Sequence, residues 1–265
     1  MFLIINKYLT KIPILKRVYP SIINKILIFL NKNIFIIKFK NIYLRINIQD
    51  PIDKIIFYKN SYEEKQIKFL MDYINKNKIE VFIDIGSNIG IYSLIIGKNF
   101  KRIKILSFEP VHNTFNNLNY NINLNNLRRN IKTFNFGLSN KSGTKKMIAL
   151  KKKDYIQSGG YSFYIPKRKI HKNEIIENYK SKIGDNVIKF KNMNIIIKID
   201  VEGFEKEVLY GLKKLLSQNK ILIQIEIFKK NFNKINKILN AHKFKLINQI
   251  KNSNDFYYTN NLINI

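Results

Sequence analysis

Two short strings of the sequence carry side chains and turns that could bind a small polar ligand. The first is Asp84-Ile85-Gly86-Ser87-Asn88-Ile89-Gly90, in which an acid, an amide and two glycines end a run of apolar residues. The glycines let the backbone bend and approach a ligand closely. Ligands of open α/β sheets bind at the carboxyl ends of strands, so we expect a binding site at this turn.

The spacing of the glycines decides between two kinds of ligand. A dinucleotide fingerprint, G-x-G-x-x-G, that began at Gly86 would need glycines where Asn88 and Ile91 stand, so the cradle for a diphosphate is incomplete. Asp84 and Asn88 suit the ammonium and carboxylate groups of S-adenosylmethionine (SAM) better than they suit a diphosphate. Glu109 ends the next apolar run and is placed to accept hydrogen bonds from both hydroxyls of a ribose.

The elements that must position these residues alternate between strands and helices. A helix is expected to begin near Ser61, a suitable N-cap, and segments 244–250 and 255–259 are typical of a closing antiparallel hairpin. This alternation predicts a Rossmann-like α/β fold, a mostly parallel sheet with helices on both faces. Apolar runs predict strands at 42–48, 81–85, 103–108, 132–138, 195–201 and 221–228, and helical spacing predicts helices at 91–96, 115–127 and 205–216.

Two regions lie outside this alternation. Residues 1–60 are expected to form a basic, amphipathic N-terminal helical extension, and residues 61–265 the main domain. Residues 139–194 are too many for a simple crossover, so we expect one crossover helix and a substrate-side insertion. Segment 159–164 of that insertion, with two glycines and two tyrosines, could line an acceptor pocket, although ordinary loop packing is the simpler interpretation.

The second string, Lys198-Ile199-Asp200-Val201-Glu202-Gly203-Phe204-Glu205, closes a predicted strand. It resembles the Lys-Ile-Asp-Val-Glu-Gly-x-Glu hallmark of the FkbM family of SAM-dependent methyltransferases. Residues 81–93 resemble the family's Asp-x-Gly-Ala-Asn-x-Gly-x-Tyr-Ser block, and Phe108-Glu109-Pro110 resembles its Phe-Glu-Pro. The strand that ends in Glu226 resembles a further acid-bearing strand, but Phe228 replaces a histidine that often follows it.

This resemblance implies a class I methyltransferase fold, with SAM as the cofactor. It also implies that the acceptor is a hydroxyl of a sugar, a glycan or a glycolipid-linked molecule. Two residues join the expected cofactor site: Tyr92 from the first block, and Ser139 from a string similar to the family's Ala-Leu-Ser. The expected cofactor-binding residues are then Asp84, Gly86, Asn88, Gly90, Tyr92, Glu109 and Ser139.

Methyl transfer from a sulfonium is an in-line displacement, in which the enzyme mainly aligns the acceptor with the methyl group. A sugar hydroxyl has a high pKa, so a base or a cation near the developing alkoxide would help. Asp200 is expected to be that base or to orient the acceptor. Lys198 could hold that acid's charge, stabilise the oxyanion or form a structural ion pair, and Glu202 could shape the turn or bind acceptor hydroxyls. The three histidines lack the spacing of metal ligands, and we expect no metal.

The chain carries 48 Lys and Arg against 18 Asp and Glu, a net charge of +30. This charge could serve a nucleic acid or an anionic membrane surface. Codon bias in an AT-rich genome would produce the same Lys-, Asn- and Ile-rich composition and is the favoured explanation. No stretch approaches the ~20 apolar residues of a spanning helix, and no secretory signal is evident, so we expect a cytoplasmic protein. Its N-terminal arm either touches a membrane or packs on the domain.

Two other functions compete with the methylation of a glycan. A nucleic-acid methyltransferase would use the basic surface. However, Asp200-Val201-Glu202-Gly203 stands where such enzymes carry Asn/Asp-Pro-Pro-Tyr, and its acids would repel phosphate. A non-catalytic binder of anionic surfaces would not need Asp84, Asn88 and Glu109 together. The sequence therefore favours a glycan methyltransferase.

Overall fold

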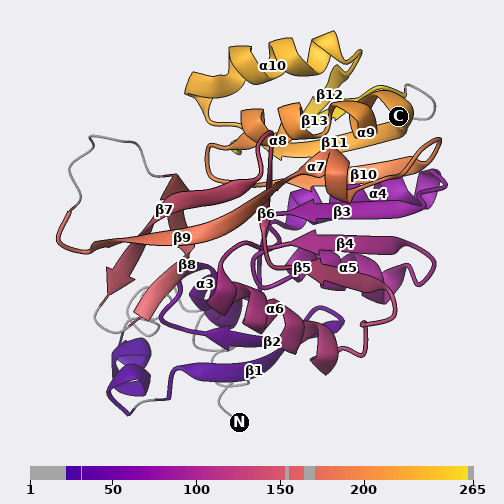
Figure 1. Ribbon diagram of the computed structural model, residues 1–265. Coiled ribbons are helices and arrows are strands. Elements are labelled where there is room, and N and C mark those ends of the chain that lie inside the picture. The colour runs from indigo at the N-terminus through magenta and orange to yellow at the C-terminus, as the bar shows by residue number, and fades with distance from the viewer. Residues whose placement is uncertain (1–21, 31, 153–154, 164–170, 262–265) are drawn as a thin grey trace.

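The computed structural model describes residues 22–30, 32–152, 155–163 and 171–261. A seven-stranded sheet forms its centre (Figure 1), and all but one of these strands run parallel. The exception is the final strand, which lies antiparallel to both of its neighbours, so the predicted closing hairpin is confirmed. In sheet order, the strands are β12 (Lys245–Gln249), β13 (Asp255–Thr259), β11 (Lys220–Glu226), β10 (Asn194–Ile199), β3 (Val81–Ile85), β4 (Lys104–Phe108) and β5 (Ile131–Phe134).

Helices cover both faces of this sheet, as the sequence predicts. Successive side chains of a strand point to opposite faces. On one face Phe82, Ile196 and Leu222 belong to a core with α4 (Glu64–Lys76), α5 (Ile91–Asn99) and α6 (His112–Leu124). On the other face Ile83, Ile197 and Ile223 belong to a core with α8 (Glu205–Gly211), α9 (Lys213–Gln218) and α10 (Phe232–Ala241).

The N-terminal extension is not mainly helical in its described part. Residues 22–29 form a helix, but β1 (Ile34–Phe39) and β2 (Ile42–Asn47) then pair as an antiparallel hairpin. Helix α3 (Pro51–Lys59) follows, and the Asp50 side chain caps its first turn. The strand predicted at 42–48 from its alternating apolar residues is confirmed as β2, whereas β1 is a strand that the sequence did not indicate. The rest of the predicted extension, residues 1–21, lies outside the described residues.

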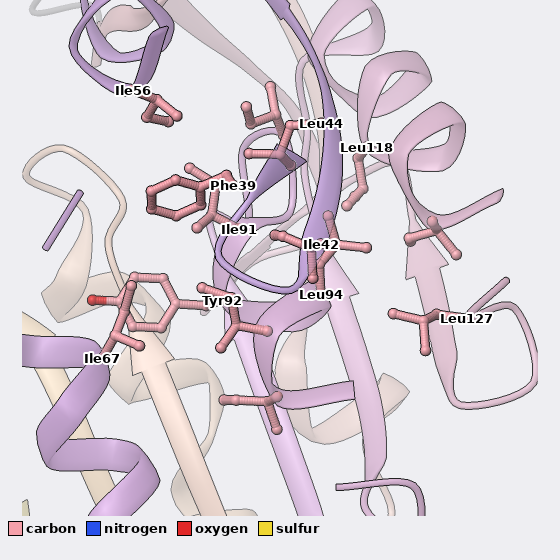
Figure 2. Packing of buried hydrophobic residues seen from close by; sticks show 14 of the residues in the cluster. Phe39, Ile42, Leu44, Ile56, Ile67, Ile91, Tyr92, Leu94, Leu118 and Leu127 are labelled. Carbon is pink, nitrogen blue, oxygen red and sulfur yellow. The ribbon is translucent and has the colours of Figure 1, made fainter. Parts of the chain in front are cut away.

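The hairpin contributes to the main core instead of forming a separate unit. Figure 2 shows Phe39, Ile42 and Leu44 of the hairpin packed with Leu94 of α5 and Leu118 of α6. All five side chains are fully buried. Removal of this apolar surface from water fixes the hairpin on the helical layer.

Three asparagines on and just after α6 form hydrogen bonds with backbone groups on the edge of β2 that faces away from β1. Asn125 accepts a hydrogen bond from the Tyr43 N–H (2.8 Å) and donates one to its carbonyl (2.6 Å). Asn121 accepts from the Arg45 N–H (2.7 Å), and Asn117 donates to the Arg45 carbonyl (3.1 Å). The spacing of four residues places all three on one side of the helix. Side-chain amides thus pair an edge whose free backbone groups could recruit another strand.

Replacing Asn121 with alanine is expected to lower the free energy of unfolding by about 2 kcal/mol, because buried backbone groups lose their partners. Asn121 is fully buried and also donates to the Ile89 carbonyl at 3.1 Å. Chemical denaturation of the two proteins measures the change. The exposed Asn116 on the same helix is the matched control, and equal losses from Asn116→Ala and Asn121→Ala would contradict the role of the buried amide.

The segment between β5 and β10 folds as a second sheet. The predicted strand 132–138 is two strands in the structure: β5 belongs to the large sheet, and the strand that begins at Gly137 belongs to the smaller one. The expected crossover helix is wrong for the described residues, where only α7 (Gly184–Val187) is helical. Residues 174–183 alternate between the two faces and form a strand instead. The strands of this second sheet, in sheet order, are β6 (Gly137–Ser139), β9 (Glu174–Ile183), β7 (Gly143–Lys152) and β8 (Tyr155–Phe163).

The start of α4 differs from its prediction. The helix begins at Glu64, and Glu63 instead of Ser61 occupies the N-cap, with a left-handed backbone (φ 39°) and no side-chain capping bond. The Glu63 carboxylate accepts a hydrogen bond from the Tyr92 hydroxyl instead. A tertiary contact thus takes the place of a local cap.

None of the helices in the described ranges is long and apolar enough to cross a membrane.

Candidate active site

The glycine turn after β3 brings the ends of three strands together. Gly86 has a φ of 82°, and a Cβ at this position would lie 1.8 Å from the Asp200 carbonyl oxygen after β10. The Gly86 and Ser87 N–H groups both donate to the Phe108 carbonyl of β4 at 3.0 Å. Any other residue at position 86 would force these strand ends apart, which explains the glycine.

A cavity with about 1000 Å³ of empty volume, including its open mouth, lies beside this turn. The carboxyl ends of β3, β4 and β10 form its floor, as expected for an open α/β sheet. The second sheet forms a wall through Met147, Tyr161 and Tyr179. Among the predicted site residues, Asp84, Gly86, Asn88, Tyr92, Glu109, Lys198, Asp200 and Glu202 line this cavity.

Polar oxygens without partners mark one end of the cavity. Asp84 Oδ2 accepts a hydrogen bond from Ser93 Oγ at 2.6 Å, while the other oxygen, Oδ1, is buried without a partner in the described structure. Ser87 Oγ and Asn88 Oδ1 are in the same state. Buried polar atoms normally have partners, so this end is suited to a polar ligand. The charged ammonium of SAM could donate to these oxygens, and the residues present therefore fit this cofactor.

Glu109 is held in one orientation at the end of β4. Its two carboxylate oxygens accept hydrogen bonds from the N–H groups of Asn88 and Val111, both at 2.9 Å. Burial raises the pKa of Glu109 to about 7, although these two bonds oppose the shift. A carboxylate fixed in this way can accept hydrogen bonds from a pair of ribose hydroxyls, as the sequence predicts.

A buried lysine lies among the acids at the centre of the site. Lys198 Nζ forms an ion pair with Asp200 at 2.8 Å and lies 4.8 Å from the centre of the Tyr92 ring. Burial acts to lower the pKa of Lys198, but Asp200, Glu63 and Asp84 together hold it above its usual range. The lysine therefore stays charged and neutralises part of this acid cluster, the role that the ion-pair alternative assigns to it.

Asp200 also forms a carboxyl pair with Glu226, which ends the neighbouring strand β11. Ile199 and Ile225 are register partners, so the next residues of both strands lie side by side. Burial acts to raise the pKa of Asp200, but Lys198 and a hydrogen bond from Glu226 hold it below its usual range. Burial and the Asp200 charge raise the pKa of Glu226 to about 8. Near neutral pH the Glu226 carboxyl is therefore mostly protonated, and its O–H donates a hydrogen bond to the Asp200 carboxylate.

The two other acids after β10 have different surroundings. Glu202 lines the cavity with a left-handed backbone (φ 52°), and burial together with the Asp200 charge raises its pKa to about 7. Glu205 is buried at the first turn of α8 and accepts a hydrogen bond from the Gly203 N–H at 2.7 Å. Glu205 therefore shapes the turn, and Glu202 remains available to a ligand.

Two of the predicted cofactor residues do not reach the cavity. Gly90 (φ 92°) is the N-cap of α5, and a Cβ there would lie 2.5 Å from Leu118, so it serves helix packing. Ser139 is buried in β6, and strand alternation turns its neighbour Leu138 toward the cavity in its place. The Tyr92 ring lines the cavity, but its hydroxyl donates to Glu63 and accepts from Gln224.

The structure adds two residues, Glu226 and Glu63, that sequence reasoning does not assign to the site. Glu226 is visible in the sequence as an acid that ends a strand, but its pairing with Asp200 depends on strand order. Glu63 precedes a helix and carries no motif. Tyr161 lines the cavity from β8, which goes beyond loop packing, whereas Tyr164 lies outside the described residues.

The fold and the site together define a Rossmann-like methyltransferase. The family model for the methyltransferase FkbM domain matches residues 84–246, which is more than half of the chain. The protein therefore belongs to the FkbM methyltransferase family, and the predicted class of SAM-dependent methyltransferases is confirmed.

Curated relatives of the chain carry the same activity in their names. The chain is 26% identical over 198 residues to methyltransferase sdnD of Sordaria araneosa, an alignment that covers 60% of this chain and 73% of the relative. It is 27% identical over 144 residues to methyltransferase 1 of Beauveria bassiana (strain ARSEF 2860), an alignment that covers 49% of this chain and 57% of the relative.

Solved structures show only a distant similarity of fold. TYW2 of M. jannaschii, in complex with AdoMet, is 12% identical with a TM-score of 0.43, and 86% of this chain and 84% of that chain are covered. The precorrin-6y C5,15-methyltransferase of Geobacter metallireducens GS-15 is 11% identical with a TM-score of 0.44, and 75% and 88% are covered.

Proposed function

We propose that this enzyme transfers the methyl group of SAM to a hydroxyl of a sugar, a glycan or a glycolipid-linked acceptor. The carboxyl pair of Asp200 and Glu226 carries this proposal, because it places a proton-accepting group beside the cavity of the glycine turn. When bound, SAM supplies the methyl group on a sulfonium that is already activated. The residues of the chain then have to position both partners and receive a proton.

The cofactor end of the cavity comprises the glycine turn and Glu109. Glu109 is expected to bind the ribose, and the unpaired oxygens of Asp84 and Asn88 the ammonium group of the methionine part. Asp84 cannot turn away, because Ser93 holds its other oxygen and is itself hydrogen bonded to Ser107 at 2.7 Å. This end is therefore preorganised for its ligand.

The acceptor end lies between Asp200 and the wall of the second sheet. The hydroxyl of Tyr161 donates to Glu177 at 2.8 Å, which holds the aromatic ring at the wall. Aromatic rings pack well on the apolar faces of sugars. A second hollow, bordered by Asn135 and Lys180, shares Tyr161 and Tyr179 with this cavity. An acceptor longer than one sugar could extend into this hollow.

Replacing Asp200 with asparagine is expected to lower kcat about 10²- to 10⁴-fold, the usual contribution of a general base, while SAM still binds. The wild-type rate should rise with pH up to about 8, where Glu226 loses its proton and the pair becomes more basic. Glu226→Gln should flatten this rise. Transfer of labelled methyl groups from SAM to a panel of sugars and glycolipids, over a range of pH, measures both effects.

The exposed acid Asp72, which pairs with Lys68 on the surface of α4, provides the control. Asp72→Asn should leave the rate and its pH profile unchanged. Transfer of label to RNA at ~200 mM salt, with none to any hydroxyl acceptor, would overturn the proposal in favour of nucleic-acid methylation.

A further inference from the structure

The N-terminal region exposes an unusual number of large apolar side chains. Four of them lie on the helix of residues 22–29 and the residue after it, and three more lie on the hairpin (Figure 1, indigo). Phe29 is 86% exposed. A group of exposed large apolar side chains in one region indicates a binding surface. We call these seven residues the apolar patch: Ile22, Ile26, Phe29, Leu30, Ile34, Ile36 and Tyr43.

The helix and the hairpin follow each other directly in the chain and are tied together. Positions 22, 26, 29 and 30 follow helical spacing and share one side of the helix. Ile34 and Ile36 alternate with the buried Ile37 and Phe39, so they point away from the core. The Ile48 N–H donates to the Asn33 carbonyl at 2.9 Å, which ties the end of the helical segment to the hairpin. The core shown in Figure 2 uses the inner side of the hairpin, and no described residue buries Ile34 and Ile36 on its outer side.

The charged residues in the segment of the chain that carries the apolar patch all have the same sign. Residues 1–49 contain seven Lys, two Arg and no acid. Lys25, Lys32 and Lys38 are exposed beside the patch. Apolar side chains flanked by lysines are the pattern of a surface that lies in the interface of a membrane. Each lysine near an anionic leaflet adds to the attraction.

We propose that the apolar patch inserts into the surface of an anionic membrane, with Phe29 as the deepest side chain. Helix α3 links this surface to the catalytic cavity: Ile52 lines the cavity, and Ile55 of the same helix is exposed. The enzyme would then present its cavity to acceptors that are held in the membrane. Membrane binding itself does not depend on which acceptor is methylated.

The absence of tryptophan from the chain permits a direct test. Phe29→Trp places a single fluorophore in the apolar patch, and Leu246→Trp places one at a 44% exposed position on β12 as the matched control. We expect vesicles of phosphatidylcholine and phosphatidylserine to shift the emission of the Phe29→Trp protein to the blue, and brominated lipid chains to quench it. The emission of the Leu246→Trp protein should stay unchanged.

Equal responses of the two fluorophores would overturn the proposal, since they would show that the net charge alone attaches the protein to vesicles. An emission of the Phe29→Trp protein that is already blue-shifted and does not respond to vesicles would also overturn it, because residues 1–21 or a second copy would then cover the patch. In co-sedimentation, Phe29→Ser should weaken binding to the same vesicles roughly ten- to hundredfold, the effect of one buried aromatic side chain. Leu246→Ser should have no such effect.

Discussion

Alanine in place of Glu109 is expected to weaken SAM binding about 100-fold or more. Two ribose hydroxyls would lose a charged acceptor, and hydrogen bonds to charged groups contribute about 1.5–3 kcal/mol each. The carboxylate also holds the N–H groups of Asn88 and Val111, so its loss loosens the loop that faces the ligand. Titration calorimetry of the wild type and Glu109→Ala with SAM measures the difference.

The pH dependence of SAM binding gives a second readout of the same residue. The pKa of Glu109 is raised to about 7 in the free enzyme. SAM binding favours the ionised form of Glu109, so below pH 7 binding should release a proton from this residue. The Kd for SAM should then increase up to about tenfold for each pH unit below 7. The heat of binding should then depend on the ionisation enthalpy of the buffer.

The exposed Glu64 is the control for a loss of charge. Glu64→Ala should change neither the affinity nor its pH dependence. Unaltered SAM binding by a folded Glu109→Ala protein would contradict the assignment of the cofactor end of the cavity.

Methionine in place of Lys198 should have the largest effect on stability, lowering the free energy of unfolding by about 3–5 kcal/mol at pH 8. The side chain is buried, and its loss would leave Asp200, Asp84 and Glu63 without the cation that they share. Removing one partner of a buried ion pair leaves an uncompensated charge, which is costly. Denaturant unfolding of the two proteins at several pH values measures the change.

The sign of the pH dependence follows from the same acids. In the wild type, Lys198 lowers the pKa of Asp200. This contribution to stability is present above the pKa of the unfolded state and is lost as the pH falls. Without the lysine, the buried acids bind protons more tightly in the folded state than in the unfolded state, so the variant should lose stability as the pH rises. The difference between the two proteins should therefore be smaller at pH 5 than at pH 8.

A second Lys–Asp pair provides the control for this prediction. Lys68 and Asp72 are 2.7 Å apart with side chains that are 75% and 54% exposed. Because water screens such a pair, Lys68→Met should cost at most about 1 kcal/mol. Similar losses from Lys68→Met and Lys198→Met would contradict the role of the buried lysine.

Local patterns in the sequence determine most of the large sheet. Apolar runs at 81–85 and 103–108 that end in Gly86 and Glu109 are sufficient to predict two strands and the turns that follow them. They succeed because a parallel strand buried on both faces must be apolar along its length. The acid-rich string after β10 is equally local, and so is the family resemblance that it carries.

Tertiary structure alone decided the rest. The pairing of Glu226 with Asp200 requires β11 to lie beside β10, and the contact of Glu63 with Tyr92 joins the N-cap of α4 to α5. Segment 139–194 forms a sheet through partners far apart in the chain, and its length alone does not distinguish a sheet from a crossover helix. Local spacing fixes which residues face a core, but only the packing of distant elements fixes which charges share one site.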